Sequence, residues 1–92
     1  MRYFLDSSAL AKRFHNELGT DIVHEIFAQY GRVIFVSELA MVELVSVAGM
    51  KQRTGALSAN GATTFLRQAT VSAAIGDFEV QQLNERDYQI AS

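Results

Sequence analysis

Short apolar runs alternate with segments of helical periodicity along this chain. Residues 2–6 contain the continuous apolar run Tyr3–Leu5, and Val33–Val36 form a second run of the same kind. Such runs, with no polar position between their members, are typical of parallel strands that are buried on both faces. A weaker apolar signal near residues 78–82 predicts a third strand.

Serine residues indicate where three helices begin. Ser7 or Ser8 is expected to cap a first helix that ends near residue 14 or 15, since a serine hydroxyl can accept a hydrogen bond from the first helical turn. Ser37 and Ser58 are expected to cap two later helices in the same way. The alternation of strands with helices predicts an α/β domain with a parallel sheet.

Two further helices are predicted from helical spacing and from capping residues. Thr20 is the expected cap of a helix that Gly31 ends. The apolar positions of this helix fall on one face: they are Ile22, Val23, Ile26, Phe27 and Tyr30. Asn84 is the expected cap of a final helix that contains Tyr88 and Ile90.

Two carboxylates lie at positions that the hydrophobic pattern predicts to be in the core. Asp6 ends the first apolar run, and Glu43 is the only charged residue within residues 39–49 of a helix that is apolar on nearly all sides. Such a helix is expected to be largely buried. An isolated buried carboxylate is costly unless it is paired, protonated or bound to a metal. The two acids therefore indicate either a shared acidic site, or a capping Asp6 and a Glu43 on a thin exposed edge.

The spacing of these acids favours one location. Ligands of open parallel α/β sheets bind beyond the carboxyl ends of the strands. Asp6 follows the first strand, Ser37 ends the second, and Glu43 lies about two turns into the next helix. One strand–helix–helix–strand unit accounts for the stretch of chain between Asp6 and Glu43. It returns Glu43 to the end of the sheet at which Asp6 lies. Two carboxylates at one rim suit Mg²⁺ or Mn²⁺ better than zinc.

Composition limits the possible functions. The chain has 92 residues, of which 49% are hydrophobic, as expected for one globular domain of modest stability. Its net charge of −2 excludes a general basic surface for nucleic acid. The absence of cysteine excludes disulfides and thiolate metal sites and fits a cytoplasmic protein. No apolar run reaches the length of a membrane span, so no membrane partner is expected.

Two segments carry a family resemblance. Tyr3–Lys12, with the sequence YFLDSSALAK, resembles the opening of a PIN domain, a hydrophobic strand followed by D-[ST]-S-A-L. Ser37–Glu43, with the sequence SELAMVE, resembles the second signature of that family. Together and in this order, the motifs are similar to the VapC-like toxin branch. The resemblance implies a PIN-like three-layer α/β fold in which residues 1–92 are the N-terminal two-thirds, so the fold is expected to be C-terminally incomplete.

The resemblance also implies an activity. A VapC-like protein would be a Mg²⁺- or Mn²⁺-dependent RNA endonuclease, the toxin of a toxin–antitoxin pair. Asp6 would be a direct metal ligand, and Glu43 would be a ligand or would orient a metal-bound water. Further family acids are expected beyond the end of this chain, so cleavage by residues 1–92 should be absent or impaired. The alternative is a catalytically incomplete module that binds a partner or antitoxin and cleaves nothing.

Four other residues near Asp6 are candidates for contact with RNA or with the metal site. Ser7 could hold the ligand sphere or contact a phosphate, and Ser8 is expected to support the site or cap the helix. Lys12 and Arg13 could meet a phosphate backbone, although solvated helix surface is the more ordinary interpretation. His15 and His24 are expected to be ordinary residues on exposed helical faces, because no glutamate or second histidine lies at ligand spacing.

The resemblance finally implies self-association. In the PIN family the first strand is central, so Arg2–Leu5 would lack one neighbour here and would expose an apolar edge. Such an edge pairs readily with another chain. The chain is therefore expected to form a homodimer or higher oligomer, by strand pairing or by exchange of its final helix.

Overall fold

The computed structural model describes residues 1–82, and the helix expected after Asn84, with Tyr88 and Ile90, lies outside them. The elements in chain order are β1 (Arg2–Leu5), α1 (Ser7–Phe14), α2 (Thr20–Ala28), β2 (Val33–Ser37), α3 (Glu38–Arg53), α4 (Ala59–Ala74) and β3 (Glu79–Gln81). Helices and a three-stranded parallel sheet confirm the predicted α/β class, including the third strand near residues 78–82.

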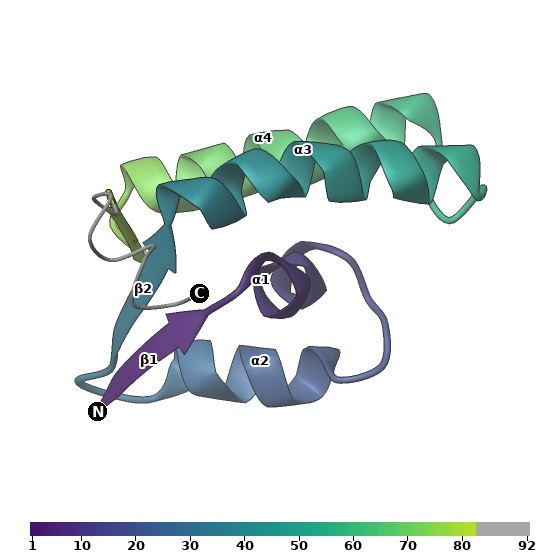
Figure 1. The fold of residues 1–92 in the computed structure, drawn as a ribbon. Coiled ribbons are helices and arrows are strands. Elements are labelled where there is room, and N and C mark those ends of the chain that lie inside the picture. The colour runs from purple at the N-terminus through teal and green to yellow at the C-terminus, as the bar shows by residue number, and fades with distance from the viewer. Residues whose placement is uncertain (83–92) are drawn as a thin grey trace, which may run out of the picture.

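The sheet has the strand order β1-β2-β3, and both pairings are parallel. Leu5 pairs with Val36, which pairs in turn with Val80. Each crossover between neighbouring strands consists of two helices (Figure 1). Within residues 1–82, β1 pairs only with β2, so its other edge has no strand beside it.

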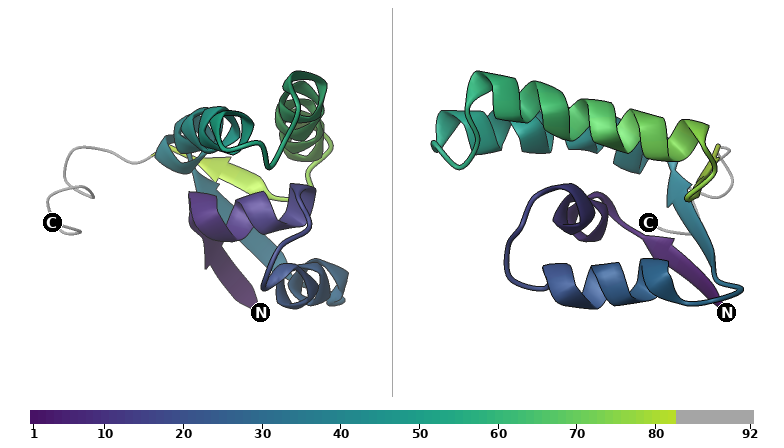
Figure 2. Two further views of the ribbon diagram at one scale, coloured as in Figure 1. Left: turned by 90° about the vertical axis from the view of Figure 1, so that its right-hand side faces the viewer. Right: turned by 180° about the vertical axis from the view of Figure 1, so that it is seen from behind.

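The four helices gather on one side of the sheet, so the described residues form two layers (Figures 1 and 2). A third layer was expected on the opposite face, but none of these helices covers that face. Phe4 is 73% exposed there and stacks on Phe35 with ring centroids 5.0 Å apart. The prediction that β1 is buried on both faces is therefore wrong, because only Leu5 of that strand is buried.

The core lies between the sheet and the helices. Its largest fully buried side chains come from both strands and helices: Leu10, Ile34, Val36, Leu44 and Phe65. The helix predicted after Ser58 is confirmed, with the Ser58 hydroxyl accepting from the amide of Gly61 at 2.9 Å. This helix supplies Phe65 and Ala69 to the core.

Helix α3 is not largely buried, contrary to the prediction from its composition. Ala40, Leu44 and Ala48 form its buried face, which packs against α1 and α4. The opposite face is open to solvent although it is apolar, with Val42 67% and Val45 60% exposed. A helix that is apolar on all sides has no polar face to show which side meets solvent.

The start and inner face of α2 also differ from the prediction. Gly19 is the N-cap, with a φ of 95° that favours glycine, and Thr20 is the first helical residue. Thr20 is buried, and its hydroxyl bonds the loop that precedes the helix. Val23 and Phe27 face the core, whereas Ile22 and Tyr30 are exposed, because α2 packs through one narrow face.

No helix within residues 1–82 combines the length and the apolar character needed to cross a membrane.

Candidate functional site

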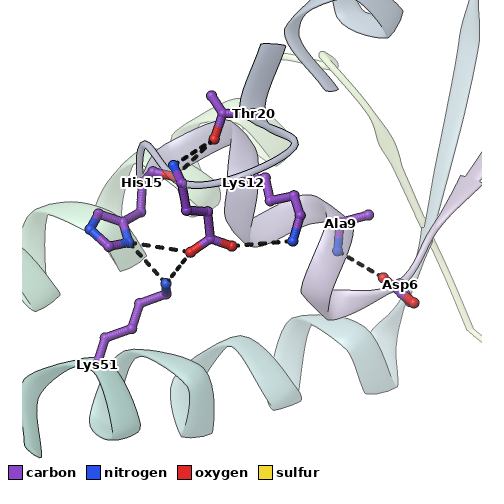
Figure 3. A network of polar contacts seen from close by, with 7 residues as sticks. Asp6, Ala9, Lys12, His15, Thr20 and Lys51 are labelled. Carbon is purple, nitrogen blue, oxygen red and sulfur yellow. Dashed lines mark hydrogen bonds and ion pairs between the residues drawn. The ribbon is translucent and has the colours of Figure 1, made fainter. Parts of the chain in front are cut away.

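Asp6 caps the N-terminus of α1. Its Oδ1 accepts a hydrogen bond from the amide of Ala9 at 2.8 Å (Figure 3). The expectation that Ser7 or Ser8 caps this helix is therefore wrong, since both residues lie inside its first turn. The cap holds Asp6 directly beyond the carboxyl end of β1, where its carboxylate is exposed.

A pocket at the carboxyl ends of the three strands contains Asp6. This strand-end pocket has a volume of about 280 Å³ and is lined by Phe4, Leu5, Asp6, Ser37 and Gln81. All three strands contribute because they are parallel and end at the same edge. A ligand-sized opening at this edge is the expected place for a binding site in an open parallel sheet.

Ser37 and Glu43 come from the end of β2 and the start of α3. Ser37 is the N-cap of α3, as predicted, and its hydroxyl accepts from the amide of Ala40 at 3.0 Å. Glu43 lies on the exposed side of the helix. It lines a second pocket of about 310 Å³, the α3 pocket, together with Ser7, Ser46, Val47 and Met50.

The two acids do not share one pocket. Asp6 lines the strand-end pocket, whereas Glu43 lines the α3 pocket with Ser7, the residue that follows Asp6. The premise that both carboxylates are buried is wrong, because both are exposed. The plainer interpretation, a capping Asp6 and a Glu43 on an exposed helix edge, matches their local geometry.

The free oxygen of Asp6 can still serve a cation. Ala9 occupies Oδ1, and within residues 1–82 no protein group donates a hydrogen bond to Oδ2. Exposed carboxylate oxygens are the donors that Mg²⁺ prefers, and this ion is often held by only one or two carboxylates and several waters. The donor chemistry of Asp6 and Glu43 therefore fits the expected metal. In the described part of the chain, however, no three potential metal-binding side chains come together.

A polar cluster centred on Glu17 was not predicted. Glu17 lies in the loop after α1, and its carboxylate pairs with Lys51 of α3 and with Lys12 of α1 (Figure 3). Lys51 also donates to Nδ1 of His15 at 2.9 Å. The hydrogen bond from Lys51 is the main cause of the lowered pKa of Glu17. Burial opposes this effect, and the hydrogen bond from Lys12 makes a smaller contribution that lowers the pKa further.

This cluster lies near Ser7 and Ser8, the candidate site residues at the start of α1. Ser7, Ser8, Glu17 and Lys51 line a pocket of about 260 Å³ together with neighbouring apolar side chains. Lys51 is 34 residues from Glu17 in sequence, so no local motif could have indicated the pairing. His15 is the C-cap residue of α1 and is half-buried, so the expectation of an exposed helical face is wrong for it.

The structure gives Lys12 and Arg13 partners within the protein. Lys12 bonds Glu17 at 3.3 Å. The guanidinium of Arg13 lies 4.4 Å from the ring centroid of Phe27 and donates to Nδ1 of His24 at 2.7 Å. Neither cation projects toward the strand-end pocket as one of its lining residues.

A comparison with models of known protein families finds no match to this chain. A comparison with curated proteins finds no match either.

Proposed function

We propose that this chain is part of a divalent-cation-dependent ribonuclease with a PIN-like fold, the toxin of a toxin–antitoxin pair. The observation that carries the proposal is the pocket at the carboxyl edge of the sheet, which holds Asp6 after β1 and Ser37 at the end of β2. These are the positions that the two sequence motifs assign to the site. An RNA substrate and the absence of cysteine are consistent with a protein that acts in the cytoplasm.

The residues would divide the work as follows. Asp6 offers its free oxygen to a Mg²⁺ or Mn²⁺ ion while its other oxygen holds the first turn of α1 in place. Glu43 offers a second carboxylate from the α3 pocket, and Ser7, which follows Asp6 in sequence and lines the α3 pocket with Glu43, offers a hydroxyl to a phosphate. A bound divalent cation supplies positive charge that stabilises the charge developing on a phosphate during hydrolysis.

The two carboxylates that residues 1–82 supply should bind the cation weakly, because further negative charge raises the affinity of such a site. We therefore expect slow or undetectable RNA cleavage by this chain. The cation site can be tested apart from turnover, since Mn²⁺ broadens NMR signals of nearby nuclei.

The first prediction concerns this cation site. Mn²⁺ should broaden the amide signals of Asp6, Ser7 and Glu43 first, and both Asp6→Asn and Glu43→Gln should reduce the effect. Asn is as good an N-cap as Asp, so Asp6→Asn removes the charge and leaves α1 capped. Asp21→Asn, on the exposed start of α2, is the matched control and should leave the broadening unchanged.

RNA cleavage provides the second arm of this test. Any Mn²⁺-dependent cleavage of structured RNA should disappear in Asp6→Asn and persist in Asp21→Asn. Broadening confined to other surface acids such as Asp77, or cleavage that Asp6→Asn retains, would exclude the proposed site.

One observation favours a second function, a module that binds a partner such as an antitoxin. Leu39, Val42 and Val45 give α3 an exposed apolar face. Exposed apolar faces on small proteins often mark sites of protein association. This function requires no metal and no turnover, so Asp6→Asn would leave it intact.

We also propose that the chain self-associates through β1. Within residues 1–82 this strand has one free edge, and Phe4 next to it is 73% exposed. A free strand edge offers unpaired amide and carbonyl groups to another chain.

A further inference from the structure

A pocket between α1, α2 and α4 lies apart from the strand-end pocket. Its volume is about 550 Å³, compared with about 280 Å³ for the pocket that contains Asp6. Its walls carry Arg13, Phe14, His24, Arg67, Gln68 and Val71. We call it the basic pocket. Ligand sites for small molecules commonly have volumes of this order.

The charge of this pocket is positive. It has no carboxylate among its lining residues, and within residues 1–82 neither Arg13 nor Arg67 pairs with a carboxylate. Lys12 and Lys51, in contrast, are both paired with Glu17. The nearby carboxylate of Asp77 is engaged by Ser72, a further lining residue, which donates a hydrogen bond to it at 3.2 Å. The C-terminal end of α1 adds a partial charge of about −0.5 nearby, which two guanidinium groups outweigh. The pocket is therefore suited to an anion.

Arg13 is held in place before any ligand arrives. Its guanidinium stacks on Phe27 at 4.4 Å and donates to Nδ1 of His24 at 2.7 Å. A pre-organised arginine loses less freedom when it binds a phosphate, because its planar donors are already oriented. Since Nδ1 of His24 accepts this bond, the proton of the neutral ring is on Nε2, which remains a donor.

One wall of the basic pocket is apolar. The ring of Phe14 packs edge to face on Phe65, with centroids 6.4 Å apart, and is thereby held in one orientation. Val71 is 50% exposed and lies one helical turn after Arg67 on α4. An aromatic ring beside two arginines presents a surface for a planar base and donors for a phosphate.

We infer that the basic pocket binds a nucleotide, with the phosphate on Arg13 and Arg67 and the base against Phe14 and Val71. The nucleotide can be a free mononucleotide or one unit of an RNA strand, since both present the same groups. This binding uses neither Asp6 nor a divalent cation, so it does not depend on the proposed ribonuclease activity.

The test is an NMR titration of the whole chain without divalent cations. The probes are adenosine monophosphate, adenosine, inorganic phosphate and a short oligoadenylate. Adenosine monophosphate should shift the amides of α4 around Arg67 and bind more tightly than adenosine or phosphate. Arg67→Ala should weaken its binding about tenfold, the loss expected for one charge-assisted contact. Arg53→Ala removes the same charge from an exposed position on α3 and should have no effect.

The remaining comparisons identify the source of the nucleotide. Tighter binding of oligoadenylate than of adenosine monophosphate, with the same loss in Arg67→Ala, identifies an RNA strand, and the reverse order identifies a free nucleotide. Arg67 is exposed on α4, so its replacement should not affect folding, which circular dichroism can verify. Absence of shifts at millimolar adenosine monophosphate, or equal binding by the wild type and Arg67→Ala, would overturn the inference.

Discussion

Among single residues, Glu17 has the clearest energetic role. Its carboxylate pairs with two lysine ammonium groups and joins the loop after α1 to α3. The side chain of Lys51 is only 11% exposed, so this contact is better shielded from water than a typical surface ion pair. The lowered pKa of Glu17 therefore records a contribution to folding stability.

The pH dependence follows from the direction of that shift. Because the folded-state pKa is below the ordinary value of 4.5, the contribution is complete above that value and is lost as the pH falls through the folded pKa. Lys51→Met should lower the free energy of unfolding by about 1 kcal/mol at pH 7 and reduce the loss of stability below pH ~4.5. Urea denaturation at several pH values measures both effects.

The matched control for Lys51→Met is Arg53→Met, which removes an exposed cation of the same helix and should leave the pH profile unchanged. Equal stability of the wild type and Lys51→Met between pH 7 and pH ~3 would show that the Glu17 cluster adds nothing to stability.

Sequence reasoning located the strand-end residues but not their environment. The position of Asp6 after β1 follows from an apolar run that stops at a polar residue. Whether Asp6 is exposed depends on whether other parts of the chain cover the carboxyl edge of the sheet. A local sequence pattern contains no information about this. Glu17 was missed because its main partner, Lys51, is brought close only by the packing of α1 against α3. The basic pocket was missed for the same reason, since the packing of α1 and α4 brings Arg13 and Arg67 to the same pocket.

Among the helices, α3 has two apolar faces, of which one is buried and the other is exposed to solvent. The face with Leu44 packs into the core, where this side chain is 1% exposed. The face with Val42 and Val45 meets solvent. The caps at Ser37 and Ser58 were predictable because each is a local hydrogen bond between residues three apart. Which face of α3 is buried was not predictable, because both faces are apolar.

Substitutions on the two faces of α3 should have different effects on the free energy of unfolding. Val42→Gln and Val45→Gln should change the free energy of unfolding by less than about 0.5 kcal/mol, as is usual at exposed positions. Leu44→Ala should cost about 2–5 kcal/mol, because it leaves a cavity in the core. Urea denaturation of the three variants provides the measurement.

A cost of several kcal/mol for Val42→Gln would mean that something covers this face in solution. If the face binds a separate partner, as in the second candidate function, the two glutamine variants should fold normally and lose that binding.

Taken together, residues 1–82 form a sheet with helices on one face and with β1 as one of its two free edges. β1 pairs only with β2 within residues 1–82, and Phe4 is exposed beside Phe35 on the uncovered face. A protein of 92 residues buries a modest share of its surface. A second copy that covered this region would bury apolar surface that the single chain leaves exposed.

Sedimentation at micromolar concentration should therefore show a dimer or larger assembly. Phe4→Lys should shift the distribution toward monomer, because a lysine on this surface opposes association of strands. Tyr30→Lys is the matched control: it replaces an exposed aromatic residue in the turn before β2 and should leave the assembly unchanged. A wild-type chain that sediments as a monomer would contradict the proposed association.

The strand order has a consequence for the route by which the chain reaches its native state. Each strand pairs with the next strand in sequence, so neither pairing has to wait for a more distant segment. Arg2 meets Val33, and Phe35 later meets Glu79. The second loop closure is longer, but the two have similar entropic costs because this cost grows only with the logarithm of loop length. The β1–α1–α2–β2 unit can therefore close before β3 joins the sheet. β2 then serves as the template on which β3 is added, so assembly from the N-terminus requires no rearrangement of the pairing already made.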